Sequence, residues 1–125
     1  MRKQYHLRPA DNGVDAWDVD GLMELSRDSP PCEVSLDSIP DIDTDYWFFD
    51  RSDRPTVRDV VEHSRLISEV DTSYPIILGP DGRVLDGMHR VARALLDRRD
   101  TISAVRLDAL PEPDFRSCRP EDLPD

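Results

Sequence analysis

The chain has 125 residues, 38% of them hydrophobic and 34% charged, which is enough for one folded domain with a single modest core. Its 16 Lys and Arg residues stand against 27 Asp and Glu residues, and the net charge of −11 excludes a broad DNA-binding face, because binding a polyanion depends on cationic contacts that release counterions. No stretch is apolar enough to span a membrane or to act as a signal peptide, and Cys32 and Cys118 form neither a metal motif nor a disulfide framework. We therefore expect a cytoplasmic protein with unpaired thiols.

The first half of the chain predicts one short helix and one strand. Apolar residues recur at helical spacing within residues 15–25, after an acidic first turn, and we expect Trp17 to pack beneath this helix. Residues 33–39 alternate between polar and apolar, as a strand with one buried face does. Residues 40–55 hold several aspartates around an aromatic run and show no period, so we expect a long, partly packed loop whose rings anchor it, although one ring could also cover a base.

A helix is predicted over residues 56–70, with Thr56 as its N-cap. Its outer face carries charged residues spaced four apart, Arg58 with Glu62 and Arg65 with Glu69. One stripe on the inner side is formed by Val57, Val60, Val61, Ser64, Ile67 and Ser68.

The second half of the chain predicts a hairpin, a helix and a closing strand. Residues 74–79 and 83–86 are expected to form antiparallel strands around a tight turn. A helix follows from Met88 to about residue 98, and we expect it to bury Val91, Ala92 and Leu95. Residues 101–107 alternate as a last strand. We therefore expect a single domain over residues 1–110, followed by an acidic, proline-rich tail over residues 111–125.

The junction between the second hairpin strand and the following helix holds Asp86-Gly87-Met88-His89-Arg90. A helix begins with backbone N–H groups that lack partners within the helix and with a partial positive charge, so it attracts anions. Gly87 allows a sharp turn and a close approach, while His89 and Arg90 add donors suited to phosphate oxygens. The spacing alone favours a structural corner over a phosphate site; in such a corner His89 packs locally and Arg90 pairs with an acidic residue.

Residues 74–107 resemble the ParB/sulfiredoxin-like superfamily. Pro75-Ile76-Ile77-Leu78 is similar to the Pro-Ile strand of that family, and Gly87-Met88-His89-Arg90 lies where sulfiredoxins carry Gly-Cys-His-Arg and ParB proteins carry Gly-Glu-Arg-Arg. The resemblance implies a small α/β (α+β) fold, with a mixed sheet flanked by helices, that binds the phosphates of ATP or CTP with Mg²⁺. It assigns phosphate contact to Asp86, Gly87, Met88, His89 and Arg90, and an accessory role to Glu62, His63 and Pro75.

The chain also departs from this family. Met88 provides neither the thiolate of sulfiredoxin nor the carboxylate of ParB, so sulfinic-acid reduction is not expected. No helix-turn-helix reader follows the domain, so we expect no direct DNA binding. Phosphoryl transfer or nucleotide hydrolysis would need a base, either Glu62, His63 or an aspartate of residues 41–53, and we assign no catalytic residue.

A second interpretation remains open: a non-catalytic, acidic interaction or regulatory module that uses the same fold to bind a protein partner or to form a homodimer. A dedicated metal site is not expected. Residues 41–45 begin like a calcium-binding loop, but Tyr46 occupies the position of the required glycine and Ser52 that of the bidentate glutamate.

Overall fold

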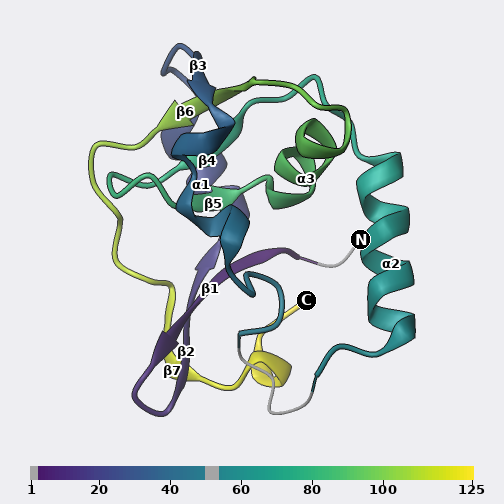
Figure 1. Ribbon diagram of the computed structural model, residues 1–125. Coiled ribbons are helices and arrows are strands. Elements are labelled where there is room, and N and C mark those ends of the chain that lie inside the picture. The colour runs from purple at the N-terminus through teal and green to yellow at the C-terminus, as the bar shows by residue number, and fades with distance from the viewer. Residues whose placement is uncertain (1–2, 50–53) are drawn as a thin grey trace.

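The computed structural model describes residues 3–49 and 54–125. The fold is mixed α and β, as the sequence predicts, with a three-stranded sheet in the order β1-β2-β7 and a four-stranded sheet in the order β3-β6-β4-β5 (Figure 1). The strands are β1 (Tyr5–Ala10), β2 (Gly13–Asp18), β3 (Cys32–Ser35), β4 (Ile76–Leu78), β5 (Val84–Asp86), β6 (Thr101–Arg106) and β7 (Phe115–Cys118). The helices are α1 (Val19–Ser26), α2 (Val57–Glu69) and α3 (Met88–Leu96), with short 3₁₀ turns at Leu36–Ser38, Pro40–Asp43 and Pro120–Asp122.

The chain begins with an antiparallel hairpin of β1 and β2 that the sequence analysis did not predict. The helix expected over residues 15–25 begins only at Val19, where the Asp18 side chain accepts a hydrogen bond from the N–H of Asp20. The helix prediction was therefore wrong over residues 15–18, because pairing with β1 overrides the local helical spacing there. Trp17 is buried at 5% exposure, but it lies in β2 rather than in the helix.

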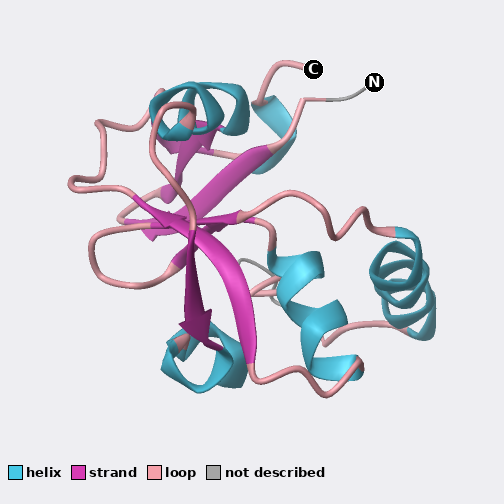
Figure 2. Ribbon diagram, turned by 90° about the horizontal axis from the view of Figure 1, so that it is seen from above, coloured by secondary structure: helices cyan, strands magenta, loops and turns pink. Residues whose placement is uncertain are grey.

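The last residues of the chain join the first sheet. Strand β7 lies within the segment expected to be an extended tail, and it pairs with β2. The indole Nε1 of Trp17 donates to the Pro111 carbonyl at 2.7 Å, and the Tyr5 hydroxyl donates to the Pro124 carbonyl at 2.6 Å. Strand β1 and the C-terminal end of the chain accordingly lie close together (Figure 2).

The second sheet contains the predicted hairpin and the predicted closing strand. Strand β4 runs parallel to β6 and antiparallel to β5, and β3 runs antiparallel to β6, which confirms the predicted hairpin and closing strand. Strand β3 is shorter than the predicted strand over residues 33–39, since it ends at Ser35. The chain then turns, so that Leu36 and Ile39 enter the core.

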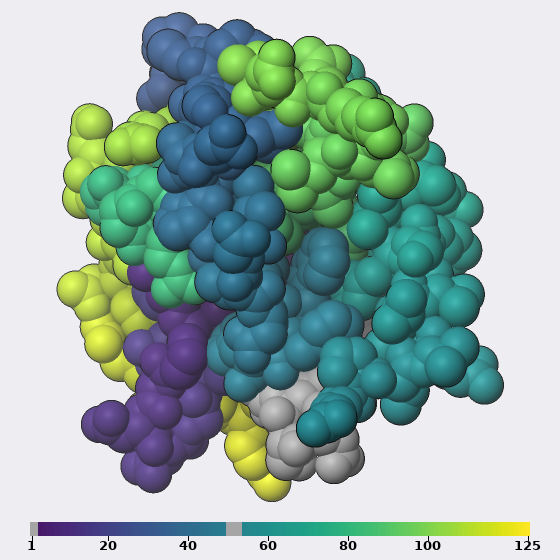
Figure 3. Space-filling model, viewed as in Figure 1, coloured from purple at the N-terminus to yellow at the C-terminus, as the bar shows by residue number. Residues whose placement is uncertain are grey.

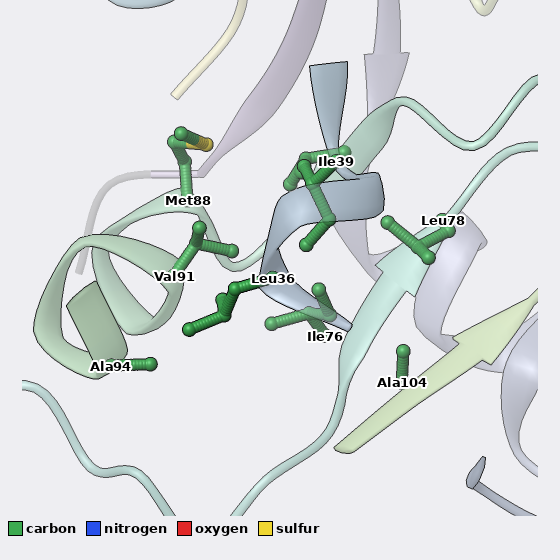
Figure 4. Close-up of a cluster of buried hydrophobic side chains, with 9 residues drawn as sticks. Leu36, Ile39, Ile76, Leu78, Met88, Val91, Ala94 and Ala104 are labelled. Carbon is green, nitrogen blue, oxygen red and sulfur yellow. The ribbon is translucent and has the colours of Figure 1, made fainter. Parts of the chain in front are cut away.

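Helix α3 covers one face of the second sheet. Figure 4 shows Val91 and Ala94 directed toward Leu36 and Ile76, and these residues are all at least 95% buried. The expected burial of Ala92 and Leu95 was wrong: Ala92 is only half-buried and Leu95 is 41% exposed, and Ala94 faces the sheet instead. Burial of such apolar side chains is the main stabilising contribution to the fold, at about 25 cal/mol for each Å² removed from water.

Helix α2 lies beside α3 on the flank of the molecule (Figure 1). A capping box starts it: the N–H of Asp59 donates to the Thr56 hydroxyl, and the Asp59 carboxylate accepts from the N–H of Thr56. No residue of α2 is fully buried. The predicted inward orientation of its apolar stripe was wrong for the valines, since Val57 is 82% exposed, whereas Ile67 is half-buried, as are His63 and Leu66.

Candidate functional site

The corner between β5 and α3 requires a glycine. Gly87 has a φ of +103°, in the left-handed region, and a β-carbon there would lie 2.7 Å from Ile76 Cγ2 and 3.0 Å from Arg90 Nη2. The Gly87 carbonyl accepts from the N–H groups of Arg90 and Val91, which starts the helix. Among the described residues, no group accepts from the N–H of Met88 or from that of His89. These two donors are the ones that a helix N-terminus offers to an anion.

The guanidinium of Arg90 is directed at the protein itself. Its Nη1 donates to the carbonyls of Tyr74 and Pro75 at 3.0 and 2.9 Å, and its Nη2 donates to Asp86 Oδ2 at 2.9 Å. The Arg90 side chain is 13% exposed and that of Asp86 16% exposed, so the pair is largely desolvated. Arg90 therefore connects the start of β4 to the end of β5. This is the structural corner that the sequence allowed, in which Arg90 pairs with an acidic residue.

The imidazole of His89 meets a histidine from α2. His63 Nδ1 and His89 Nε2 are 2.9 Å apart, so one nitrogen donates a hydrogen bond and the other accepts it. The indole of Trp47 stacks on both rings, with centroid distances of 4.3 Å to His63 and 4.6 Å to His89. The ring of Phe48 meets His63 edge-on at 5.2 Å. We call Trp47, Phe48, His63 and His89 the histidine–tryptophan cluster.

The cluster is electrically neutral near pH 7. Burial, followed by the charge of the neighbouring His63, lowers the pKa of His89 from 6.5 to about 4. Burial also lowers the pKa of His63, against the opposing effects of Asp59 and Glu62. Because neither ring is protonated at neutral pH, the imidazole of His89 adds no positive charge to the corner.

An open cleft of about 1310 Å³ extends from the corner along α1 and the end of α2. Gly87, Met88 and His89 form part of its wall. Its lining includes the acidic residues Asp20, Glu24, Glu69, Asp71 and Asp86 and the basic residues Arg27 and Arg90. The cleft thus combines free amide donors with an excess of carboxylates. Because the carboxylates repel a bare phosphate and attract a cation, the cleft favours a phosphate that is bound to a metal ion.

The structure brings some of the expected accessory residues to the corner. His63 lies in the cluster, and Pro75 contributes its carbonyl to Arg90. Glu62 does not reach the corner: it is exposed, and its carboxylate forms an ion pair with Arg65, which lowers the pKa of Glu62. Within residues 3–49 and 54–125, no group of three or more His, Cys, Asp or Glu side chains could hold a metal ion.

The aspartate-rich loop also contributes to the fold. Asp41 is 1% exposed and accepts from Arg83 Nε at 2.9 Å and from the N–H of Val84 at 2.6 Å. This carboxylate therefore holds the loop against β5. Asp50 and Asp53, which the sequence analysis counted among the candidate bases, lie outside the described residues.

The sequence did not reveal the role of Trp47. The aromatic run itself was visible, but its contact partners His63 and His89 lie far along the chain, so only the fold brings the three rings together. The third histidine, His6, is buried and is also structural. Its Nε2 accepts from Arg8 Nε at 3.0 Å, and burial lowers its pKa to about 3.

In the part of the chain that the structure describes, no helix combines the length and the apolar character needed to cross a bilayer. Comparison of the chain with protein-family models, with curated proteins and with solved structures gives no match.

Proposed function

We propose that this chain is a ParB/sulfiredoxin-like domain and that its corner binds the phosphates of a nucleotide, ATP or CTP, as the Mg²⁺ complex. The observation that carries the proposal is the pair of amide donors at the start of α3. The N–H groups of Met88 and His89 have no acceptor among the described residues, and both residues line the cleft. A phosphate oxygen is a suitable acceptor at this end of a helix dipole.

The acidic lining explains why the proposed ligand includes a metal ion. Asp86 is in direct contact with Arg90. The pKa of Asp71 is lowered chiefly by its hydrogen bonds from Ser73 and to a smaller extent by the charge of Arg90. A bare phosphate would be repelled by these carboxylates. Mg²⁺ needs only one or two carboxylates in addition to phosphate oxygens and water, so the same residues favour the magnesium complex.

Arg90 has a positioning role in this proposal. Because its N–H groups bind Tyr74, Pro75 and Asp86, it holds the corner in the shape that presents the amides. The proposal covers binding and assigns no catalytic residue. Of the expected bases, Glu62 faces Arg65 and His63 is hydrogen-bonded to His89.

Thermal unfolding with ATP, ADP, CTP and GTP, each with and without Mg²⁺, tests this proposal. A ligand that binds only the folded state raises the melting temperature. We expect a saturable rise with at least one nucleotide that requires Mg²⁺. The Asp71→Asn variant should weaken this response, since it removes a charge but keeps an acceptor for Ser73.

The matched control is Asp28→Asn, because Asp28 is exposed and does not line the cleft. This variant should respond as the unaltered protein does. The absence of any shift with all four nucleotides in Mg²⁺ would refute nucleotide binding.

A second candidate function is a protein-interaction module with the same fold. The observation that favours it is the exposed apolar side of α2, where Val57, Val60 and Val61 are 82%, 56% and 60% exposed. This role and the first do not exclude each other, since the cleft and the apolar side of α2 are different surfaces.

We further propose that the protein acts in the cytoplasm and does not bind DNA directly. Cys32 and Cys118 are both free thiols, as is typical of a reducing compartment. The net charge of −11 opposes contact with a polyanion.

A further inference from the structure

Helix α2 carries its apolar residues on a face that the rest of the described chain leaves mostly open: its three valines are more than half exposed, and Ile67 is half-buried. We call this the α2 apolar face; it consists of Val57, Val60, Val61, Ser64, Ile67 and Ser68. These residues follow the spacing of one helical stripe, and no charged residue interrupts it. The protein contacts α2 through His63, which lies beside this stripe, and through Ile67 at the edge of the stripe, so the exposed valines have no role in its own core.

The apolar surface continues onto α3. Ser64 and Ile67 of α2 line a shallow groove of about 450 Å³ together with Ala92, Leu95 and Leu96 of α3. Leu95 is 41% exposed and Leu96 67% exposed. Figure 3 shows α2 at the surface along this flank, and Figure 2 shows α2 and α3 beside each other there. A continuous exposed apolar surface on two helices is typical of a protein-binding site.

A row of alternating charges borders the α2 apolar face and indicates what binds to it. The row is Arg58, Glu62, Arg65 and Glu69. If two copies of α2 lie antiparallel, the row of one copy faces the same row running in the reverse direction. Arg58 then lies opposite the partner's Glu69, and Glu62 lies opposite the partner's Arg65, so every charge meets one of opposite sign. The same register places Val60 opposite Ile67. In a two-fold contact between antiparallel helices, each flanking row meets its own copy, and this row is complementary to itself.

We propose that α2 pairs antiparallel with α2 of a second copy of this chain, apolar face against apolar face. Ser64 lies near the middle of the helix, where its small side chain allows the two backbones to approach closely. Leu95 and Leu96 of each copy extend the contact beyond α2. The helix has 13 residues and is about 20 Å long, so the contact runs along the whole flank.

The choice of a second copy rests on this self-complementarity. A foreign helix would need the matching order of charges, whereas the chain already contains it. The valines of the contact lie outside the proposed nucleotide site, because the cleft reaches only the end of α2, at Leu66, Glu69 and Val70. Glu69 borders both surfaces, so Val60→Glu is the variant that separates dimerisation from nucleotide binding. Dimerisation and nucleotide binding can therefore be tested independently.

Sedimentation equilibrium of the full chain measures the proposed contact directly. We expect a mass of twice 14.3 kDa that gives way to the monomer on dilution. The Val60→Glu variant should be monomeric, because a charge would be buried within the contact. Its circular dichroism and melting temperature at high dilution should match those of the unaltered monomer, since Val60 is 56% exposed.

Charge reversal tests the antiparallel register. Arg58→Glu should raise the dimer dissociation constant about tenfold, because two attractive contacts become repulsive in the symmetric pair. The double variant Arg58→Glu/Glu69→Arg should restore the original dissociation constant. Arg106→Glu is the control: Arg106 is exposed on β6, away from α2, and this reversal should leave the constant unchanged.

Three results would overturn the proposal. A monomeric mass at every concentration would show that the α2 apolar face does not bind a second copy, whatever else it binds. A dimer that persists in Val60→Glu would place the contact elsewhere. Failure of the double charge variant to restore a dimer weakened by Arg58→Glu would exclude the antiparallel register.

Discussion

His63 Nδ1 lies 2.9 Å from His89 Nε2, and the indole of Trp47 stacks on both rings. This contact joins α2 to the first turn of α3, and therefore to the corner that starts at Gly87. Because burial keeps the rings neutral, the contact is a hydrogen bond between two uncharged imidazoles. Its strength accordingly depends on pH.

Acidification should destabilise the protein through His89. The pKa of His89 is about 4 in the folded protein, below its ordinary value of 6.5, so the unfolded chain binds this proton at a higher pH than the folded protein does. The resulting stabilisation is complete above about pH 6.5 and is lost as the pH falls toward 4. We expect a loss of about 1–2 kcal/mol from this half-buried ring after solvent screening.

Urea unfolding of the protein and of His89→Gln at pH 7.5 and pH 4.5 measures this loss. Gln does not titrate, so the variant should lose less free energy of unfolding than the unaltered protein over this interval. Equal losses in the two proteins would mean that His89 is not responsible.

Removal of Trp47 should raise the pKa of His63 and that of His89. The indole covers one face of each ring, and burial is the main cause of the lowered pKa values. In Trp47→Leu we expect the pKa of His89, followed by its imidazole NMR signals, to move from about 4 toward 6.5. Trp17→Phe, which alters a ring that stacks on neither histidine, should leave the pKa near 4. An unchanged value in Trp47→Leu would show that the indole does not desolvate the ring.

Replacement of Gly87 by alanine should destabilise the corner by about 2–4 kcal/mol. The new methyl group would contact Ile76 and Arg90, and alanine would have to adopt a φ of +103°. Gly21→Ala is the matched control. Gly21 lies inside α1 with nothing within 4 Å of an added β-carbon, so alanine there should stabilise the protein by about 0.5–1 kcal/mol. Chemical unfolding of both variants measures the two changes in the free energy of unfolding. If both changes had the same sign, Gly87 would not need its left-handed conformation.

Replacement of Arg90 by methionine should lower the free energy of unfolding by about 2–4 kcal/mol. Two carbonyls and the Asp86 carboxylate would lose their donor in a largely desolvated position. A second change, Asp86→Asn, should recover part of the loss because it removes the unpaired charge. The exposed Arg106→Met should change the free energy by less than about 0.5 kcal/mol. If Arg90→Met were equally mild, Arg90 would not hold the corner together.

The sequence predicted the part of the fold in which local signals agree. Three such features follow one another along the chain: the strands around Gly82, the left-handed Gly87 and the periodic helix after it. Each is determined by residues that are close together in the sequence. The hairpin of β1 and β2 was missed even though Asp11-Asn12-Gly13 is a typical turn sequence. The spacing around Trp17 suggested a helix, and only pairing with β1 decides against it.

Side-chain partners were less predictable than elements. The sequence placed His89 and Arg90 at the start of a helix, but many acidic residues could have paired with Arg90, and only the fold selects Asp86. Helical spacing identified the α2 apolar face correctly as a stripe. It could not show that the protein contacts a different side of the helix, because periodicity does not specify what a face packs against.

The most direct test of the proposed function follows the backbone amides of Met88 and His89 by ¹H–¹⁵N NMR during titration with MgATP or MgCTP. If the corner binds phosphate, these two amide signals move with nucleotide concentration until they saturate, because the amides donate to phosphate oxygens, and the corresponding nucleoside without phosphates leaves them unmoved. Amide signals that stay in place at the highest concentration of both nucleotides would contradict phosphate binding at the corner.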